Sequence, residues 1–293
     1  MFLLPDDAFL VIFEFLLDSV DNVDGWHTLI HVCQQWRNVI LSSPRRLNLR
    51  ILCTGGRPVR EMLDIWPAFP ITIQDYGDTI LLDGEADNII AALEHPGRVG
   101  EIRLVEIPSS LLEIFAAAMK EPFPMLTTLE LQLDHGGPRS VLPDSFFGAV
   151  PRLRVLDLTG LPFSAVRNLL LSTSELVYLC LWDMPISGNA SEPKEIVTCL
   201  SAMTKLESIE LGFCSSFYPY RASRHTLPPP LTRVLLPALT HFWFQGDSGY
   251  LGDLMAHLDT PLLDGVSIIK PYWGISDSIG NSPHLSLDSF ALG

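Results

Sequence analysis

Basic side chains are scarce in this chain of 293 residues. Lysine and arginine together number 19, against 34 aspartates and glutamates, so the formal net charge is −15. The basic residues form no cluster larger than pairs such as Arg45-Arg46. Because so acidic a surface repels phosphate groups, we expect neither nucleic acid nor an anionic membrane surface among the partners.

The spacings typical of metal and catalytic sites are also missing. The five cysteines are far apart, and no two have the CxxC spacing. His27 and His31 are four residues apart, but no further ligand follows at a suitable spacing, which favours a histidine pair without a metal. The chain contains no G-x-S-x-G string, and we interpret Asp247-Ser248 as a turn and helix cap. We expect no metal, no cofactor and no enzymatic activity.

Long apolar runs are absent as well, since none reaches the roughly 18 residues of a membrane-spanning helix. The N-terminal stretch is apolar, but it carries Asp6, Asp7 and Glu14 and no early basic residue, unlike a secretory signal. We therefore expect a soluble protein of the cytoplasm or nucleus with reduced cysteines. Its hydrophobic fraction of 47% is enough for a substantial core.

Two helical patterns occupy the first 50 residues. After Pro5, apolar spacing predicts a helix with the stripe Phe9, Ile12, Phe13 and Leu16. A second helix, ending before Pro44, is predicted by the stripe Leu29, Val32, Cys33, Trp36 and Ile40. The first helix is apolar nearly all round, because Leu10, Val11 and Leu17 lie on other faces. Helices this short cannot bury so much apolar surface among themselves, so we expect a partner to cover part of it.

A repeat with the template L-x-x-L-x-L begins near residue 97. It occurs seven times, with starts 23 to 33 residues apart, at Val99-Ile102-Leu104, Leu126-Leu129-Leu131, Leu153-Leu156-Leu158, Leu176-Leu179-Leu181, Leu206-Ile209-Leu211, Leu239-Phe242-Phe244 and Leu263-Val266-Ile268. This period indicates leucine-rich repeats, although the asparagine or cysteine that usually follows the last leucine is present only as Cys214. Helical segments are predicted between the strands, at residues 109–120, 164–171, 193–203 and 248–258.

Alternating strands and helices predict an α/β fold. Its form is an irregular leucine-rich-repeat solenoid, with a parallel sheet on the concave face and helices outside. We expect three parts: an all-helical domain at residues 1–50, a connecting or capping unit at 51–96, and the solenoid at 97–293.

The N-terminal residues resemble an F-box. The pattern of that family opens with Leu-Pro, continues with an aliphatic-Phe pair and a Leu, and later has Val-Cys-x-x-Trp-Arg. The chain carries these elements as Leu4-Pro5, Ile12-Phe13, Leu16 and Val32-Cys33-Gln34-Gln35-Trp36-Arg37. With its degenerate repeats, the chain is similar over nearly its full length to a large F-box family with irregular leucine-rich repeats found in mushroom-forming fungi.

The resemblance implies a non-catalytic substrate receptor of an SCF-type cullin-RING ubiquitin ligase. Its F-box would bind the Skp adaptor, its repeats would hold a target protein, and other subunits would transfer ubiquitin for degradation of the target. The residues expected at the adaptor are Leu4, Pro5, Leu10, Ile12, Phe13, Val32 and Trp36. Packing inside the helices is the alternative for each, with Pro5 and Ile12 favoured for the partner. The alternative function is a leucine-rich-repeat interaction scaffold without a ligase role.

The position of the target-binding face follows from strand geometry. Side chains alternate along a strand, so template positions three, five and seven point away from the core onto the concave sheet. The side chains expected to bind the target there are Glu130, Asp157, Tyr178, Trp182, Glu210 and Trp243. An acidic face with an aromatic patch suits a basic ligand. In the alternative interpretation, the irregular repeats turn these aromatic rings into the core.

Overall fold

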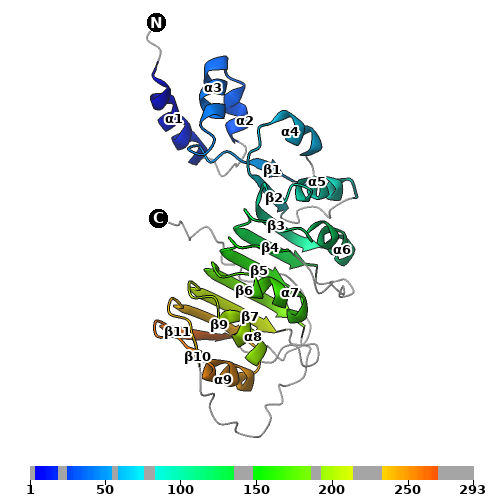
Figure 1. Cartoon of the computed structure of the whole chain (residues 1–293), viewed down its shortest axis with the longest axis vertical. Helices are drawn as coiled ribbons and strands as arrows, with labels where there is room; N and C mark the ends of the chain where they lie inside the picture. Colours follow the sequence, from blue (N-terminus) through cyan, green and yellow to red (C-terminus); the bar gives the residue numbers. More distant parts are fainter. Residues whose placement is uncertain are drawn as a thin grey trace.

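The computed structural model describes residues 4–18, 25–54, 59–75, 83–134, 148–185, 193–213 and 233–269. They form a mixed α/β structure on one large parallel sheet, with no closed barrel in the described part (Figure 1). Its strands are β1 (Ile51–Cys53), β2 (Ile71–Asp75), β3 (Val99–Ile107), β4 (Thr128–Leu133), β5 (Val155–Thr159), β6 (Tyr178–Met184), β7 (Ser208–Phe213), β9 (His241–Gln245) and β11 (Gly265–Ile269). Their order in the sheet follows their order in the sequence. The predicted α/β class is confirmed.

Helices connect many of the strands. Their bounds are α1 (Asp6–Asp18), α2 (Gly25–Ile30), α3 (Gln34–Ser42), α4 (Val59–Ile65), α5 (Asp83–Leu93), α6 (Ser109–Ala118), α7 (Phe163–Leu171), α8 (Pro193–Leu200) and α9 (Ser248–Ala256). A separate small parallel sheet pairs β8 (Val234–Leu235) with β10 (Leu258–Asp259). Among the described helices, none has the length and apolar character needed to cross a membrane.

All seven strands predicted from the repeat are present, as β3 to β7, β9 and β11. The segment 51–96, expected to be a connecting or capping unit, contributes β1 and β2 to the same sheet. Ile71 of β2 pairs in parallel with Val99 of β3, so the sheet continues across the boundary expected at residue 96. Strand β2 lies outside the predicted repeat because its sequence, ITIQD, lacks the leucine template.

Alternate residues of strands β2 to β7 and β9 form the main hydrophobic core, whereas Val266 and Ile268 of β11, expected to point into the core, are exposed. In β4 and β5, these are Leu129, Leu131, Leu156 and Leu158, all of them buried. Helices α5 to α9 contribute their buried side chains to the same cluster. Burying a leucine stabilises the fold by about 1.5–3 kcal/mol relative to leaving it in water. These core strands therefore keep their apolar template residues toward the helices, and the residues between them lie on the opposite side, which we call the sheet face.

Helices α1, α2 and α3 form a helical head with a second hydrophobic core. Its buried members include Phe13 and Trp26, and it extends to Ile51 of β1. The indole Nε1 of Trp26 donates a hydrogen bond to the carbonyl oxygen of Arg50 at 2.9 Å. The head is thus packed on the first strand of the sheet (Figure 1).

The single second helix predicted in this head is wrong, because the segment forms α2 and α3 with a turn between them. Cys33 precedes α3 with an extended backbone, at φ −159°. The guanidinium Nε of Arg37 donates to the carbonyl oxygen of Ile30 at 3.1 Å. The last carbonyl groups of a helix have no hydrogen-bond donor within the helix. The Arg37 side chain supplies a donor to one of them at the end of α2. Val32 lies in the turn and is exposed.

Strands β3 and β6 contain β-bulges, so their pairing with the next strand is irregular. The register of β3 shifts against β4, and that of β6 shifts against β7. Within each shift one residue, Glu106 in β3 and Asp183 in β6, adopts a left-handed conformation, with φ of 56° and 49°. A bulge bends its strand and re-aims the neighbouring side chains. The shift in β6 lies between Leu181 and Met184 and so includes Trp182, one of the side chains expected at the target.

We expect Leu156→Ala to lower the free energy of unfolding by about 2–5 kcal/mol, because it removes a fully buried side chain and leaves a cavity. Ile114→Ala on α6 is the control, since that side chain is 48% exposed and its truncation should cost less than about 1 kcal/mol. Urea unfolding followed by circular dichroism measures both losses. Equal losses would contradict the assignment of the core.

Candidate functional site

Helix α1 is apolar on two opposite sides. Its inner side contributes Leu10 and Phe13 to the core of the head. Its outer face, which we define as Val11, Ile12, Phe15 and Leu16, is exposed: the exposed fractions are 57%, 41%, 73% and 37%. These four positions fall on one stripe of the helix. Contiguous exposed apolar surface of this kind marks an interaction site in a soluble protein.

The residues expected at the adaptor divide into two groups. Four are exposed, namely Leu4, Pro5, Ile12 and Val32. The other three, Leu10, Phe13 and Trp36, belong to or pack against the core of the head. Trp36 lies edge-on to the ring of Phe13, with 5.0 Å between the ring centroids. The expectation that Leu10 and Phe13 contact a partner is therefore corrected, because both side chains are buried among the three helices.

Sequence reasoning missed part of the outer face. The predicted stripe joined Phe13 with Ile12 and Leu16, although Phe13 is fully buried and the other two side chains are exposed. Phe15, which is 73% exposed and the most exposed large apolar side chain in the described part of the chain, was not among the predicted residues. On a helix that is apolar all round, spacing alone does not distinguish the buried side from the exposed one. The outer face could have been recognised from Val11 and Phe15, because apolar residues four positions apart are neighbours on a helix surface.

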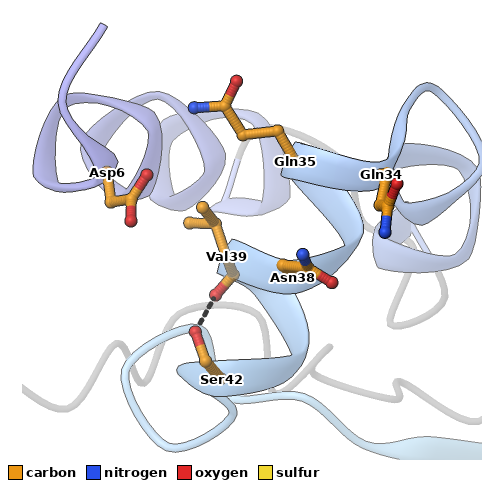
Figure 2. A pocket seen from close by; sticks show the side chains of 6 residues that line it. All are labelled: Asp6, Gln34, Gln35, Asn38, Val39 and Ser42. Carbon is orange, nitrogen blue, oxygen red and sulfur yellow. Dashed lines mark hydrogen bonds between the residues drawn. The ribbon is translucent and has the colours of Figure 1, made fainter.

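A polar cleft lies between the start of α1 and α3 in the same head. Its volume is about 460 Å³, and Figure 2 shows the lining side chains, which are Asp6, Gln34, Gln35, Asn38, Val39 and Ser42. The Ser42 hydroxyl donates to the carbonyl oxygen of Val39 at 3.0 Å. Asp6 is the only carboxylate among these lining residues, and the other polar ones offer neutral hydrogen-bonding groups.

The sheet face carries a row of side chains placed side by side by the strand register. We call this set the register row, and it consists of Arg103, Glu130, Asp157, Cys180, Glu210 and Trp243. Neighbouring strands are about 4.8 Å apart, so each member lies next to the following one. Three of the six are acids, all of them among the residues predicted to bind a target.

The positive charges of this region lie at the β3 end of the row. Arg103 Nη1 is 3.3 Å from Glu130 Oε1, and Arg103 Nε is 3.8 Å from Glu101 Oε2. Arg50 forms a further ion pair with Glu101. The side chains are between 17% and 29% exposed, so water screens these pairs less than it screens pairs at an open surface.

The carboxyl groups in the middle of the row repel one another. The pKa of Asp157 is raised to about 7, mainly by burial and also by the charges of Glu130 and Glu210, against a hydrogen bond from the Cys180 thiol that lowers it. Burial also raises the pKa of Glu130, whereas the positive charge of Arg103 lowers it. Burial and the neighbouring carboxylates raise the pKa of Cys180 well above its ordinary value, so its thiol stays protonated and unreactive.

The three aromatic side chains predicted on this face are half-buried there and do not belong to the main core. The alternative, in which the repeats turn the rings inward, is therefore wrong. The Tyr178 hydroxyl donates to Glu210 Oε1 at 3.0 Å. The indole of Trp182 covers Gly212, because a Cβ atom at that position would be 2.6 Å from Trp182 Cε3. Trp243 is next to Glu210 in the register row.

The structure also locates the motifs that were discounted. Asp247 caps α9 as predicted, since its Oδ1 accepts hydrogen bonds from the backbone NH groups of Gly249 and Tyr250 at 2.8 and 3.1 Å. His27 stacks on Trp26, and burial, followed by the charge of His31, lowers its pKa. Within the described residues, no group of three or more potential ligands is placed to hold a metal ion.

No protein-family model matches the chain, and no curated protein matches it. Function is therefore inferred from the residues and their geometry, of which two surfaces stand out: the outer face of α1 and the register row with its aromatic neighbours.

We expect Asp157→Asn to stabilise the protein increasingly as the pH rises from 5 to 8. The pKa of Asp157 is about 7 in the folded chain and about 3.9 in the unfolded chain, so its ionisation opposes folding progressively between these values. The gain at pH 8 should be about 1–3 kcal/mol. Urea unfolding at both pH values measures it, with Asp64→Asn, an exposed site on α4, as the charge-matched control. Stability gains that do not change with pH would contradict the repulsion.

Proposed function

We propose that this protein is the substrate receptor of an SCF-type cullin-RING ubiquitin ligase. In this proposal the helical head is the F-box that binds the Skp adaptor, and the sheet face holds the protein to be ubiquitylated. The chain itself is non-catalytic, and the protein acts in the cytoplasm or nucleus. The observation that carries the proposal is the exposed apolar outer face of α1, within the segment whose sequence resembles an F-box.

The packing of the head supports a docking role for α1. The inner side of the helix already has its core, so folding of the head does not require the outer face to be covered. Four large apolar side chains nevertheless remain partly in contact with water there, and burying the exposed part of each would recover a fraction of the ~1.5–3 kcal/mol that full burial is worth. A partner helix or groove laid against this stripe would bury that exposed part, as in other helix-mediated complexes.

The exposed members of the F-box-like pattern extend this surface. Leu4 and Pro5 lie just before α1, and Ile12 belongs to its outer face. Val32 is 58% exposed in the turn between α2 and α3. We assign these four side chains to the adaptor, together with Phe15 on the outer face. Leu10, Phe13 and Trp36 then support the surface from inside the head.

The parallel sheet supports the second half of the proposal. Strands in chain order with helices on one side are the arrangement expected of a leucine-rich-repeat solenoid, which uses its sheet as a broad binding surface. On the sheet face, half-buried aromatic rings lie beside acidic groups, and rings of this kind frequently anchor protein interfaces. The proposed target-binding side chains remain Glu130, Asp157, Tyr178, Trp182, Glu210 and Trp243.

We expect the double variant Ile12→Asp, Phe15→Asp to weaken binding of a purified fungal Skp adaptor at least about tenfold, because each carboxylate would lie in an apolar contact. Ile65→Asp is the matched control: that side chain is 70% exposed on α4, outside the proposed surface. Surface plasmon resonance measures the affinities, and circular dichroism checks the fold.

Two outcomes of this experiment would count against the ligase role. If the parent protein does not bind the adaptor, the proposal loses its main support and the interaction scaffold becomes the better description. If the parent binds but the double variant binds equally well, the outer face of α1 is not the docking surface.

A further inference from the structure

The negative charge of the register row is balanced at one end only. Arg103 pairs with the row at its β3 end, whereas Asp157 and Glu210 make no ion pair within the described part of the chain. Their hydrogen-bonding neighbours are neutral, since Cys180 donates to Asp157 and Tyr178 donates to Glu210. Two partly buried carboxyl groups therefore lie on the sheet face with no cationic partner from the described residues.

Aromatic rings surround the Glu210 end of the row. Tyr178 reaches Glu210 from β6 through its hydroxyl, and Trp243 is the next residue of the row on β9. Trp182 lies over Gly212, two residues further along β7 than Glu210 and on the same face. Because residue 212 has no side chain, the indole covers the strand surface closely. The Glu210 carboxylate therefore has an aromatic neighbour on β6 (Tyr178), another on β9 (Trp243), and the indole of Trp182 further along β7.

We propose that this half of the sheet face binds an arginine side chain of the target protein, with the Glu210 and Asp157 carboxylates as its acceptors and the indoles of Trp182 and Trp243 as its stacking surfaces. This inference rests on the receptor function proposed above and names the chemistry of its target. The occupant follows from charge complementarity, because two acidic groups that have no cationic partner among the described residues favour a positive group beside them.

Arginine fits this surface better than lysine for a geometric reason. Its guanidinium group is planar and stacks on aromatic faces while its NH groups point outward to carboxylates. Tyr178 occupies Oε1 of Glu210, and Oε2 has no hydrogen-bond partner in the described residues, so it remains available to an added donor. An ammonium group offers the same charge without a flat face, so it forfeits the stacking contact.

Arginine binding should be linked to proton release. The charged and titratable groups around Asp157 are Glu130 on β4, Cys180 and Tyr178 on β6 and Glu210 on β7, with Arg103 on β3 beyond Glu130. The pKa of Asp157, about 7 without a cation, falls when a guanidinium group sits beside it. Affinity for arginine therefore rises as the pH increases from 6 to 8, because the bound state favours the ionised carboxylate.

The test uses the full chain and the blocked peptide Gly-Gly-Arg-Gly-Gly, with matched peptides in which lysine or citrulline replaces arginine. Citrulline keeps the shape of arginine without its charge. Indole NMR shifts and tryptophan fluorescence report binding at pH 6, 7 and 8. We expect arginine to bind at least about tenfold more tightly than citrulline, as charge-assisted hydrogen bonds imply, and severalfold more tightly than lysine.

Three variants separate the contributions of charge and ring. Glu210→Gln should weaken arginine binding about tenfold, and Asp157→Asn should abolish its pH dependence. Gly212→Val, which displaces the Trp182 indole without changing the charge, should weaken arginine binding severalfold. Glu207→Gln, an exposed position beside the start of β7, is the charge-matched control and should bind arginine like the parent. Circular dichroism confirms that each variant is folded.

Equal affinity for arginine and citrulline would overturn the proposal, and so would unchanged affinity in folded Glu210→Gln. Equal affinity for lysine would overturn the preference for arginine. These outcomes are separable from failure of the ligase role, because the α1 variants leave the sheet face unchanged and the sheet variants leave α1 unchanged. If arginine binds and the adaptor does not, the binding face stands and the ligase role falls.

Discussion

The in-register parallel pairing of the strands is the constraint on which the rest of the structure depends. Once Leu129 pairs with Leu156 and Leu156 with Leu179, the leucines all face the helices, and the core is continuous from strand to strand. The same pairing necessarily aligns the residues between the leucines on the other face. The row of carboxyl groups is therefore a direct consequence of the register that forms the core.

This arrangement keeps like charges together at a cost in stability. Glu130, Asp157 and Glu210 would repel one another less if they were spread over the surface, yet the pairing holds Asp157 between the other two. Arg103 relieves the repulsion at one end and the Tyr178 hydroxyl reduces it at the other. A strained group of charges on a rigid sheet is the kind of feature that binding of an opposite charge stabilises, which is why we assign function to it.

The helical head shows a different balance between folding and function. The core around Phe13 and Trp26 holds the head together and ties it to the first strand. The outer face of α1 contributes nothing to that core, and its apolar side chains remain in contact with water. One apolar surface of this short helix therefore stabilises the fold, and the other is the docking surface in the function that we propose.

The periodic leucines by themselves determined the α/β class, the seven repeat strands and the face on which the acids and aromatic rings lie, because strand alternation is a local property of the chain. Only the tertiary structure decided which side chains are buried and which distant segments are in contact. It showed that Phe13 is buried while Ile12 and Phe15 are exposed, because only packing against α3 distinguishes the sides of an all-apolar helix. It also brought β2 into the sheet and placed the indole of Trp182 over Gly212, since both depend on contacts between residues far apart in the sequence.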